Sequence, residues 1–469
     1  MSPFWIKTLQ LILCFAILIV LHEGGHFFFA KLFKVKVEKF FMFFDWKFHL
    51  FSTKDKWFTR LFPKMKDAET EYGIGWIPLG GYVKIAGMID ESMDTEQMKQ
   101  PVKPDEFRAK PVWQRFFIMV GGVLVNFVLA LFIYAMILFT WGSDTLPMQN
   151  ISLGFSYNTT AQQLGFRDGD IPVKVDGDPI EAWDGTVYRA LSEAKYVTVL
   201  REGAEVVIEM PDEGVNLLDM IEQEPRFLAV RVPARVDSVL PESPAALVGM
   251  KSGARLLEVD GQPVDWWYQF DAVMGRKADV LASDCSHEDS VRLRALPVVF
   301  SNEEGTTPDT VVIRLTEQYM MGIVKTPYQL FYKDDYVHRN YGFWESIPAG
   351  IAYGWETLKG YVSDLKYLFS KRGAQSVGSF GTIGNLFPAV WEWDAFWNIT
   401  AFISIILAVM NILPIPGLDG GHIFFLLVEA VTRRPPSDKF MERAQYVGMA
   451  LLLALMALAL FNDAVKFLF

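Results

Sequence analysis

The chain has 469 residues, of which 51% are hydrophobic and 21% are charged, and its net charge is −11. This length leaves room for roughly two to four structural units. The acidic balance argues against nucleic acid as a partner. A purely membrane-embedded chain would carry fewer charges, so the composition favours a membrane protein with additional soluble modules.

Four apolar stretches are long enough to cross a bilayer, because a membrane helix needs about 20 residues. They cover residues 4–30, 116–141, a stretch from residue 396 that is interrupted at Pro414 and Pro416, and residues 447–468. Lysine and arginine concentrate after the first stretch, before the second, and between the third and fourth. By the positive-inside rule these ends face the cytoplasm, so both termini and the long middle section face outward.

The first apolar stretch contains His22, Glu23 and His26 in the spacing His-Glu-x-x-His. On a helix the two histidines lie about 40° apart on one face, which suits two nitrogens that bind one ion. Glu23 projects beside that ion, where it can take a proton from an attacking water. The pattern also arises by chance in charged soluble helices, but ionisable groups at bilayer depth are costly and usually functional. We therefore predict a zinc site with Glu23 as general base.

A third zinc ligand is expected from the interrupted apolar stretch. Two prolines and three glycines break the helix within residues 411–422. Irregular backbone at membrane depth is tolerated only where it is buried in protein or lines a wet cavity. Asp419 is the best candidate ligand, although it could also cap the following helix. His422 is a rival, but a fourth protein ligand would close a position that catalytic zinc keeps open.

Residues 71–88 favour strands on both sides of a turn at residues 78–81, which predicts a β-hairpin on the cytoplasmic side. A helical segment hides its backbone amides, so only an extended segment can be recognised through them. The unpaired edge of a hairpin near the active site would hold such a segment as an added strand. An ordinary hairpin without a substrate role is the alternative.

The middle section contains an internal repeat. A glycine-rich turn at Gly165 leads to Val-Asp-Gly at Asp176, and a second at Gly249 leads to Val-Asp-Gly at Asp260, with the same separation. A fixed offset predicts two copies of one unit. Both copies look like PDZ domains, which bind extended peptides or C-termini by strand addition. The pair could equally act as a size filter that keeps bulky substrates from the active site.

Apolar and aromatic side chains recur at three- and four-residue steps between residues 340 and 393. This periodicity predicts amphipathic helices, with a break near Pro348. Their aromatic content suits the outer membrane surface, whereas packing against the repeated units is the alternative.

Four segments together resemble the site-2 protease family of intramembrane zinc metalloproteases. They are His-Glu-x-x-His at residues 22–26, Gly-Gly-Tyr-Val-Lys at 80–84, Gly-x-x-x-Asn at 122–126, and residues 411–420 with Leu-Asp-Gly. The resemblance implies Zn²⁺ bound by His22, His26 and Asp419, with Glu23 as catalytic base. It also favours substrate-binding roles for Asn411, Gly80, Gly81, Tyr82 and Asn126.

The resemblance implies a polytopic α-helical membrane protein with four transmembrane helices, an inserted tandem of PDZ domains and a cytoplasmic membrane-associated β-hairpin region. Such a protein lies in the bacterial inner membrane, with periplasmic PDZ domains and an active site toward the cytoplasm. Expected substrates are single-span membrane proteins, such as an anti-sigma factor or remnant signal peptides. The expected membrane segments are residues 1–33, 113–142, 394–432 and 445–469. The regions between them are a cytoplasmic loop at 34–112, PDZ domains at 150–233 and 234–325, and extracytoplasmic helices at 340–393.

A zinc transporter and an inactive PDZ scaffold are the two alternative classes. Broken membrane helices near ligands also occur in transporters. However, the four spans show no inverted repeat, and transport needs no base beside two ligands. The intact His-Glu-x-x-His pattern argues against a scaffold that has lost its chemistry.

Overall fold

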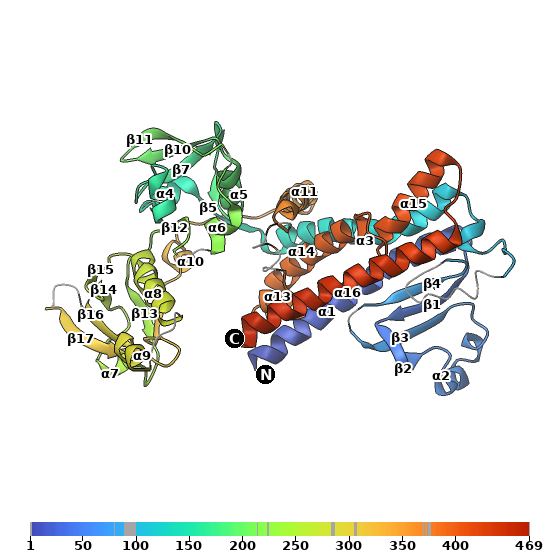
Figure 1. The fold of residues 1–469 in the computed structure, drawn as a ribbon, viewed down its shortest axis with the longest axis horizontal. Helices are drawn as coiled ribbons and strands as arrows, with labels where there is room; N and C mark the ends of the chain where they lie inside the picture. The colour runs from blue at the N-terminus through green and yellow to red at the C-terminus, as the bar shows by residue number, and fades with distance from the viewer. Residues whose placement is uncertain are drawn as a thin grey trace. The chain divides into compact units, whose positions relative to one another are not determined.

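The computed structural model describes residues 2–78, 80–88, 100–212, 214–222, 225–282, 287–303, 307–368, 370, 373 and 377–468. Leu79, which precedes the Gly-Gly-Tyr-Val-Lys segment, lies outside these residues. The chain forms two compact units (Figure 1). The first comprises residues 1–142 and 340–469, and the second comprises residues 143–339.

Four helices in the described part of the first unit are long and apolar enough to cross a membrane. They are α1 (Pro3–Leu32), α3 (Val112–Trp141), α14 (Trp393–Ile412) and α16 (Asp438–Leu468). Helix α3 packs against α1, α14, α11 (Phe343–Leu368) and α15 (Asp419–Thr432). The prediction of a polytopic helical membrane protein with additional β elements is confirmed.

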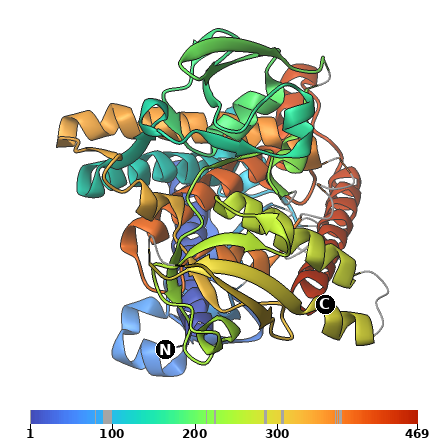
Figure 2. The same cartoon turned by 90° about the vertical axis from the view of Figure 1, so that its left-hand side faces the viewer.

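Helix α3 is approached closely on two sides through glycines. A Cβ on Gly25 of α1 would collide with the carbonyl oxygen of Gly121, and a Cβ on Gly350 of α11 would collide with the backbone of Ala135. Small residues of this kind let membrane helices pack with their backbones near each other. Helix α11 runs beside α3 (Figure 2) and is continuous through Pro348, so the predicted break there is wrong. Its packing against α3 compensates the backbone hydrogen bond that the proline removes.

The third apolar stretch is interrupted between α14 and α15 by residues 413–418. Gly417 has a φ of 97°, a conformation that glycine adopts without strain. A Cβ on Gly420 would collide with the carbonyl oxygen of Leu413, and one on Gly448 of α16 with that of Pro416. The irregular backbone is therefore covered closely by neighbouring chain, as its position in a membrane bundle requires.

A four-stranded sheet follows α1, in the order β2-β3-β1-β4. Its strands are β1 (Val37–Met42), β2 (Phe44–Ser52), β3 (Glu71–Ile77) and β4 (Tyr82–Ile85). Strand β1 pairs with β3 in parallel and with β4 antiparallel, so β3 and β4 lie on opposite sides of it. The predicted hairpin is therefore wrong. Strand β1 brings the buried Val37 and Phe41 between the two strands, and β4 becomes an edge.

The second unit contains two copies of one topology. Its two four-stranded sheets have the orders β8-β7-β10-β11 and β15-β14-β16-β17. The first copy comprises β6 (Phe155–Tyr157), α4 (Thr159–Gln163), β7 (Ile171–Val175), β8 (Asp178–Pro179), α5 (Thr186–Glu193), β10 (Tyr196–Arg201), β11 (Ala204–Glu209) and β12 (Leu228–Val230). The second comprises β13 (Val236–Val239), α7 (Pro244–Leu247), β14 (Arg255–Val259), β15 (Gln262–Pro263), α8 (Trp267–Ala282), β16 (Ala295–Ser301), β17 (Asp309–Arg314) and β18 (Ile323–Lys325).

The repeated Val-Asp-Gly sequence forms the same turn in both copies. Asp176 and Gly177 have φ values of 50° and 93°, and Asp260 and Gly261 have values of 52° and 73°. Positive φ at both central residues is the requirement of a tight type I′ hairpin turn. These turns join β7 to β8 and β14 to β15.

Shorter elements complete both units. In the first unit these are α2 (Lys56–Leu61), the 3₁₀ turns at Pro63–Met65 and Phe107–Ala109, and α13 (Phe380–Leu386). In the second they are the sheet of β5 (Ser143–Pro147), β9 (Ala182–Trp183) and β19 (Val337–Arg339), the 3₁₀ turn Met148–Asn150, and the helices α6 (Leu217–Glu222), α9 (His287–Leu293) and α10 (Tyr328–Phe331).

A buried ion pair fixes α15 against the first turn of α3. Arg115 donates to both carboxylate oxygens of Glu429, at 2.6 and 3.2 Å, and the two side chains are only 15% and 11% exposed. Removing one partner of such a pair leaves an uncompensated charge. We expect Glu429→Gln to lower the free energy of unfolding by about 3–5 kcal/mol, measured by denaturant titration in detergent.

The exposed Glu356–Lys359 pair on α11 provides the control for this measurement, because its side chains are 67% and 55% exposed. Glu356→Gln is expected to change the free energy of unfolding by less than about 1 kcal/mol. Equal effects of the two substitutions would show that the Arg115–Glu429 pair does not fix α15.

Candidate active site

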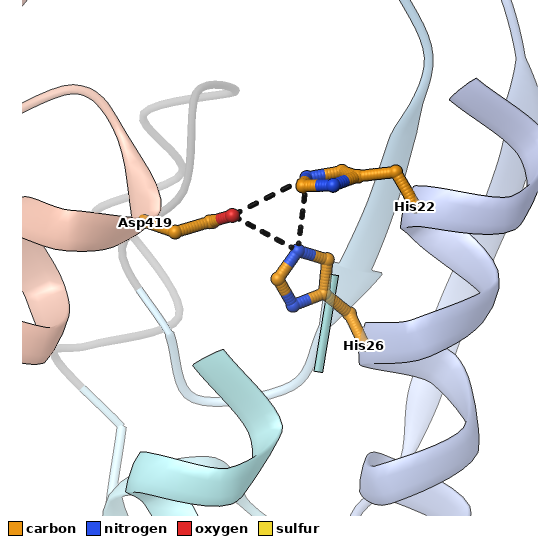
Figure 3. Close-up of side chains that lie close together, drawn as sticks. All are labelled: His22, His26 and Asp419. Carbon is orange, nitrogen blue, oxygen red and sulfur yellow. Dashed lines mark hydrogen bonds and ion pairs between the residues drawn. The ribbon is translucent and has the colours of Figure 1, made fainter. Parts of the chain in front are cut away.

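The structure brings together His22 and His26 of α1 and Asp419 of α15 (Figure 3). The Nε2 atoms of His22 and His26 lie 3.2 and 3.3 Å from Asp419 Oδ2. They lie 3.3 Å from each other. Three possible ligand atoms, two from one face of α1 and one from the start of α15, thus lie close together.

This donor set fits a zinc ion. A tetrahedral zinc about 2.0–2.1 Å from its ligands holds them about 3.3–3.4 Å apart, close to the separations seen here. Asp419 Oδ2 is buried without a well-formed hydrogen bond. Buried polar atoms are normally paired, so this oxygen suits a bond to a cation. Among the described residues the group contains three possible protein ligands and does not include His422, so a bound zinc would keep one position for water or substrate.

Helix α3 shapes the space around both imidazoles. His26 Nδ1 lies 2.8 Å from the carbonyl oxygen of Ile118, so it donates there and leaves Nε2 as the ligand atom. A Cβ on Gly122 would collide with both imidazole rings. His22 Nδ1 lies 3.2 Å from the side-chain amide of Asn126. The Gly-x-x-x-Asn segment thus contacts the two histidines directly.

Asp419 does not act as the cap of α15 through this oxygen. The N-cap position is occupied by Leu418, and Asp419 is the first helical residue. Its Oδ2 points at the histidines instead (Figure 3). The geometry therefore favours the ligand role over the capping role that the sequence left open.

Glu23 lies next to His22 and is partly buried. Its carboxylate interacts with the backbone N–H of Val83 in β4. Because this N–H faces Glu23, it points away from β1, on the outer side of the edge strand. The edge strand and the candidate base are therefore adjacent.

The predicted substrate-binding residues fall at different distances from this cluster. A Cβ on Gly81 would press on the side chain of Ile19, one turn before His22 on α1, so this glycine lies beside the site. The Tyr82 ring stacks on the rings of Phe41 and Phe44 at 5.5 and 6.4 Å, and its side chain is thus part of the sheet.

Two further predicted residues complete this comparison. Gly80 packs against Phe44, because a Cβ there would press on its ring. Asn411 is half-buried in the last turn of α14, and its side chain forms no hydrogen bond with the described part of the chain. Its amide is therefore available to another molecule.

Sequence reasoning missed the backbone groups at this site. The carbonyl of Ile118 and the N–H of Val83 carry no side-chain signal, so no motif could have identified them. Gly122 had a signal, since a spacing of four residues places it on the same helix face as Asn126. The spacing alone did not say that this face turns toward the histidines.

Comparison with protein families matches residues 10–455 to Peptidase family M50. The Regulator of sigma-E protease RseP of Salmonella typhimurium is 28% identical over 476 residues, which cover 96% of this chain and 97% of that protein. The protein of the same name from Escherichia coli is 27% identical over 484 residues, with coverage of 96% and 97%. Relatives from Ralstonia nicotianae and Neisseria meningitidis have zinc metalloprotease in their names.

The chain belongs to peptidase family M50, the site-2 protease family, because the match spans nearly its whole length. It is a zinc-dependent metalloprotease with membrane-spanning helices. The family and cofactor predicted from the sequence are confirmed.

Proposed function

We propose that the protein is an intramembrane endopeptidase that cleaves single-span membrane proteins, with His22, His26 and Asp419 as zinc ligands. The convergence of these side chains supports this proposal. His22 and His26 lie in α1, which is long and apolar enough to span a membrane, and Asp419 follows α14, another such helix, after the break. The basic residues at the ends of the spans support a site toward the cytoplasmic side, from which water would reach it.

The proposed reaction is hydrolysis of a peptide bond. Bound zinc supplies Lewis acidity, which polarises the scissile carbonyl and makes water nucleophilic near neutral pH. Glu23 takes the proton of the attacking water and passes it to the leaving amine. The Ile118 carbonyl holds the His26 ring, so that the ligand atom keeps its direction through the reaction.

Strand β4 is the proposed docking edge for the substrate. Its inner side pairs with β1, and its outer side presents the Val83 N–H beside Glu23. A substrate added along this edge would be extended next to the base, which a helical segment is not. Gly80, Gly81, Tyr82 and the Asn411 amide are proposed to hold the same extended segment.

Val83→Pro tests this edge, because proline removes the N–H that faces Glu23 on the side of β4 away from β1. One lost hydrogen bond is worth about 0.5–1.5 kcal/mol. We expect kcat/KM for a single-span peptide to fall by about 2- to 12-fold, with zinc content unchanged. Val83→Ala keeps the N–H and is the matched control, and an equal loss in both variants would contradict strand addition.

The repeated units are proposed to be tandem PDZ domains on the periplasmic side of the bacterial inner membrane. Support comes from the duplicated topology and from relatives named regulator of sigma-E protease. Because of the similarity to these relatives, an anti-sigma factor and remnant signal peptides are the proposed substrates. Peptide binding by strand addition and size filtering of substrates are the two proposed roles of the pair.

A cleavage assay with metal removal tests the proposed function. The purified full chain in detergent is given a single-span peptide, with and without a zinc chelator. We expect cleavage inside the apolar segment, loss on chelation and recovery when zinc is restored. Zinc flux into liposomes that contain the purified chain, without peptide cleavage, would indicate a transporter. Peptide binding that does not depend on zinc would indicate a scaffold. Either result would overturn the proposal.

A further inference from the structure

Asn126 lies immediately behind one of the proposed zinc ligands. It is one helical turn after Gly122, on the face of α3 that meets the imidazoles. Its side chain is completely buried, and its amide group lies 3.2 Å from His22 Nδ1. The backbone carbonyl of Asn126 accepts a hydrogen bond of 2.7 Å from Ser404 of α14, so the residue is held from both sides.

One polar atom of this amide has no partner. In the orientation shown, the NH₂ group faces His22 Nδ1 and the buried Oδ1 accepts no hydrogen bond. This arrangement needs an unprotonated Nδ1, which would put the proton on Nε2, the atom that faces Asp419. A histidine that binds metal through Nε2 instead donates from Nδ1.

Rotation of the amide by 180° removes the tautomer conflict. The two ends of an asparagine amide have nearly the same shape, and their assignment follows from the hydrogen-bond network. After rotation Oδ1 accepts from His22 Nδ1–H, and the NH₂ group takes the place that Oδ1 held. His26 already has this arrangement, with the Ile118 carbonyl as acceptor.

We infer that Asn126 is a positioning residue that fixes the tautomer and ring direction of His22 for zinc binding. The inference rests on the proposed zinc site and gives Asn126 a role other than substrate binding. A side chain with no exposed surface, enclosed between α3, α14 and His22, has no face to offer a peptide. The Gly-x-x-x-Asn segment then has one physical purpose, in which Gly122 makes room for the rings and Asn126 orients one of them.

Zinc affinity of the purified full chain, measured by competition with a chromogenic chelator, tests the inference. Asn126→Leu keeps the branched outline of the side chain but has no acceptor, and we expect its zinc affinity to fall by about 10- to 100-fold. The zinc affinity of Asn126→Ala, which adds no apolar branch, is expected to fall by a factor in the same range. Asn126→Asp keeps an acceptor at Nδ1 and is expected to stay near the wild-type affinity. Ser404→Ala, which touches only the backbone of Asn126, is the control for packing and should keep zinc affinity.

The outcomes separate this inference from the proposed function. Wild-type zinc affinity in both Asn126→Leu and Asn126→Ala would overturn the positioning role, and a raised KM in these variants would then restore the substrate role. An equal loss of affinity in Asn126→Asp and Asn126→Leu would also overturn it, because an acceptor would not matter. A wild-type chain that binds no zinc would instead overturn the zinc site itself.

Discussion

Replacing Glu23 with glutamine is expected to lower kcat/KM for a single-span peptide by about 10²–10⁴-fold, the range for loss of a general base. Glutamine keeps the shape of the side chain but cannot accept the proton of the attacking water. Glu23 contributes none of the three clustered ligand atoms, so the zinc content of the variant should stay at the wild-type level. Cleavage rates and metal analysis of the same preparation measure both quantities.

Glu69 provides the control for this substitution. Its carboxylate pairs with Lys31 at the end of α1 and is 54% exposed. Glu69→Gln should leave both the rate and the zinc content unchanged. Full cleavage by zinc-loaded Glu23→Gln would remove Glu23 from the mechanism and leave the metal site intact.

Replacing Asp419 with alanine is expected to abolish cleavage and to weaken zinc binding by more than about 100-fold, beyond the range seen for residues outside the ligand shell. The substitution leaves only the two histidines of α1, and two ligands do not hold zinc in a catalytic geometry. Zinc competition and peptide cleavage are measured together. His22→Ala should likewise lose both zinc and activity.

His422 provides the control for Asp419. It lies one turn further along α15 and is not in the ligand cluster, within the part of the chain that the structure describes. His422→Ala should therefore keep zinc. If Asp419→Ala keeps zinc and His422→Ala loses it, His422 is the third ligand and Asp419 is not.

The candidate ligands could be predicted because their signals are local. The spacing of His22 and His26 fixes their common helix face, and Asp419 stands out as a carboxylate at a break in an apolar stretch. The structure places the three side chains in one cluster. The match with Peptidase family M50 independently confirms the family that these motifs suggested.

The sheet could be predicted only in part, because strand pairing is a long-range choice. Strands β3 and β4 were recognisable from composition, but nothing within residues 71–88 shows that β1 lies between them. Helix α11 is a second example. Pro348 by itself predicts a break, but the close contact of Gly350 with α3 compensates the backbone hydrogen bond that the proline removes. In both cases a partner distant in sequence decided the outcome.

Asn126 shows a third kind of limit. Its motif was visible, and the spacing places Gly122 and Asn126 on one face of α3. Which neighbour that face meets depends on the packing of α1 against α3, where Gly25 and Gly121 bring the backbones together. A sequence motif can therefore identify a residue as functional and still leave its chemical role undefined.

X-ray absorption at the zinc edge of the purified full chain tests the central claim most directly. The account predicts one zinc per chain with two imidazole nitrogens and at least one carboxylate oxygen at about 2.0–2.1 Å. His22→Ala and His26→Ala should each lose the zinc, and the zinc-edge signal with it. Zinc held without imidazole ligands, or an unchanged spectrum in both histidine variants, would contradict the account.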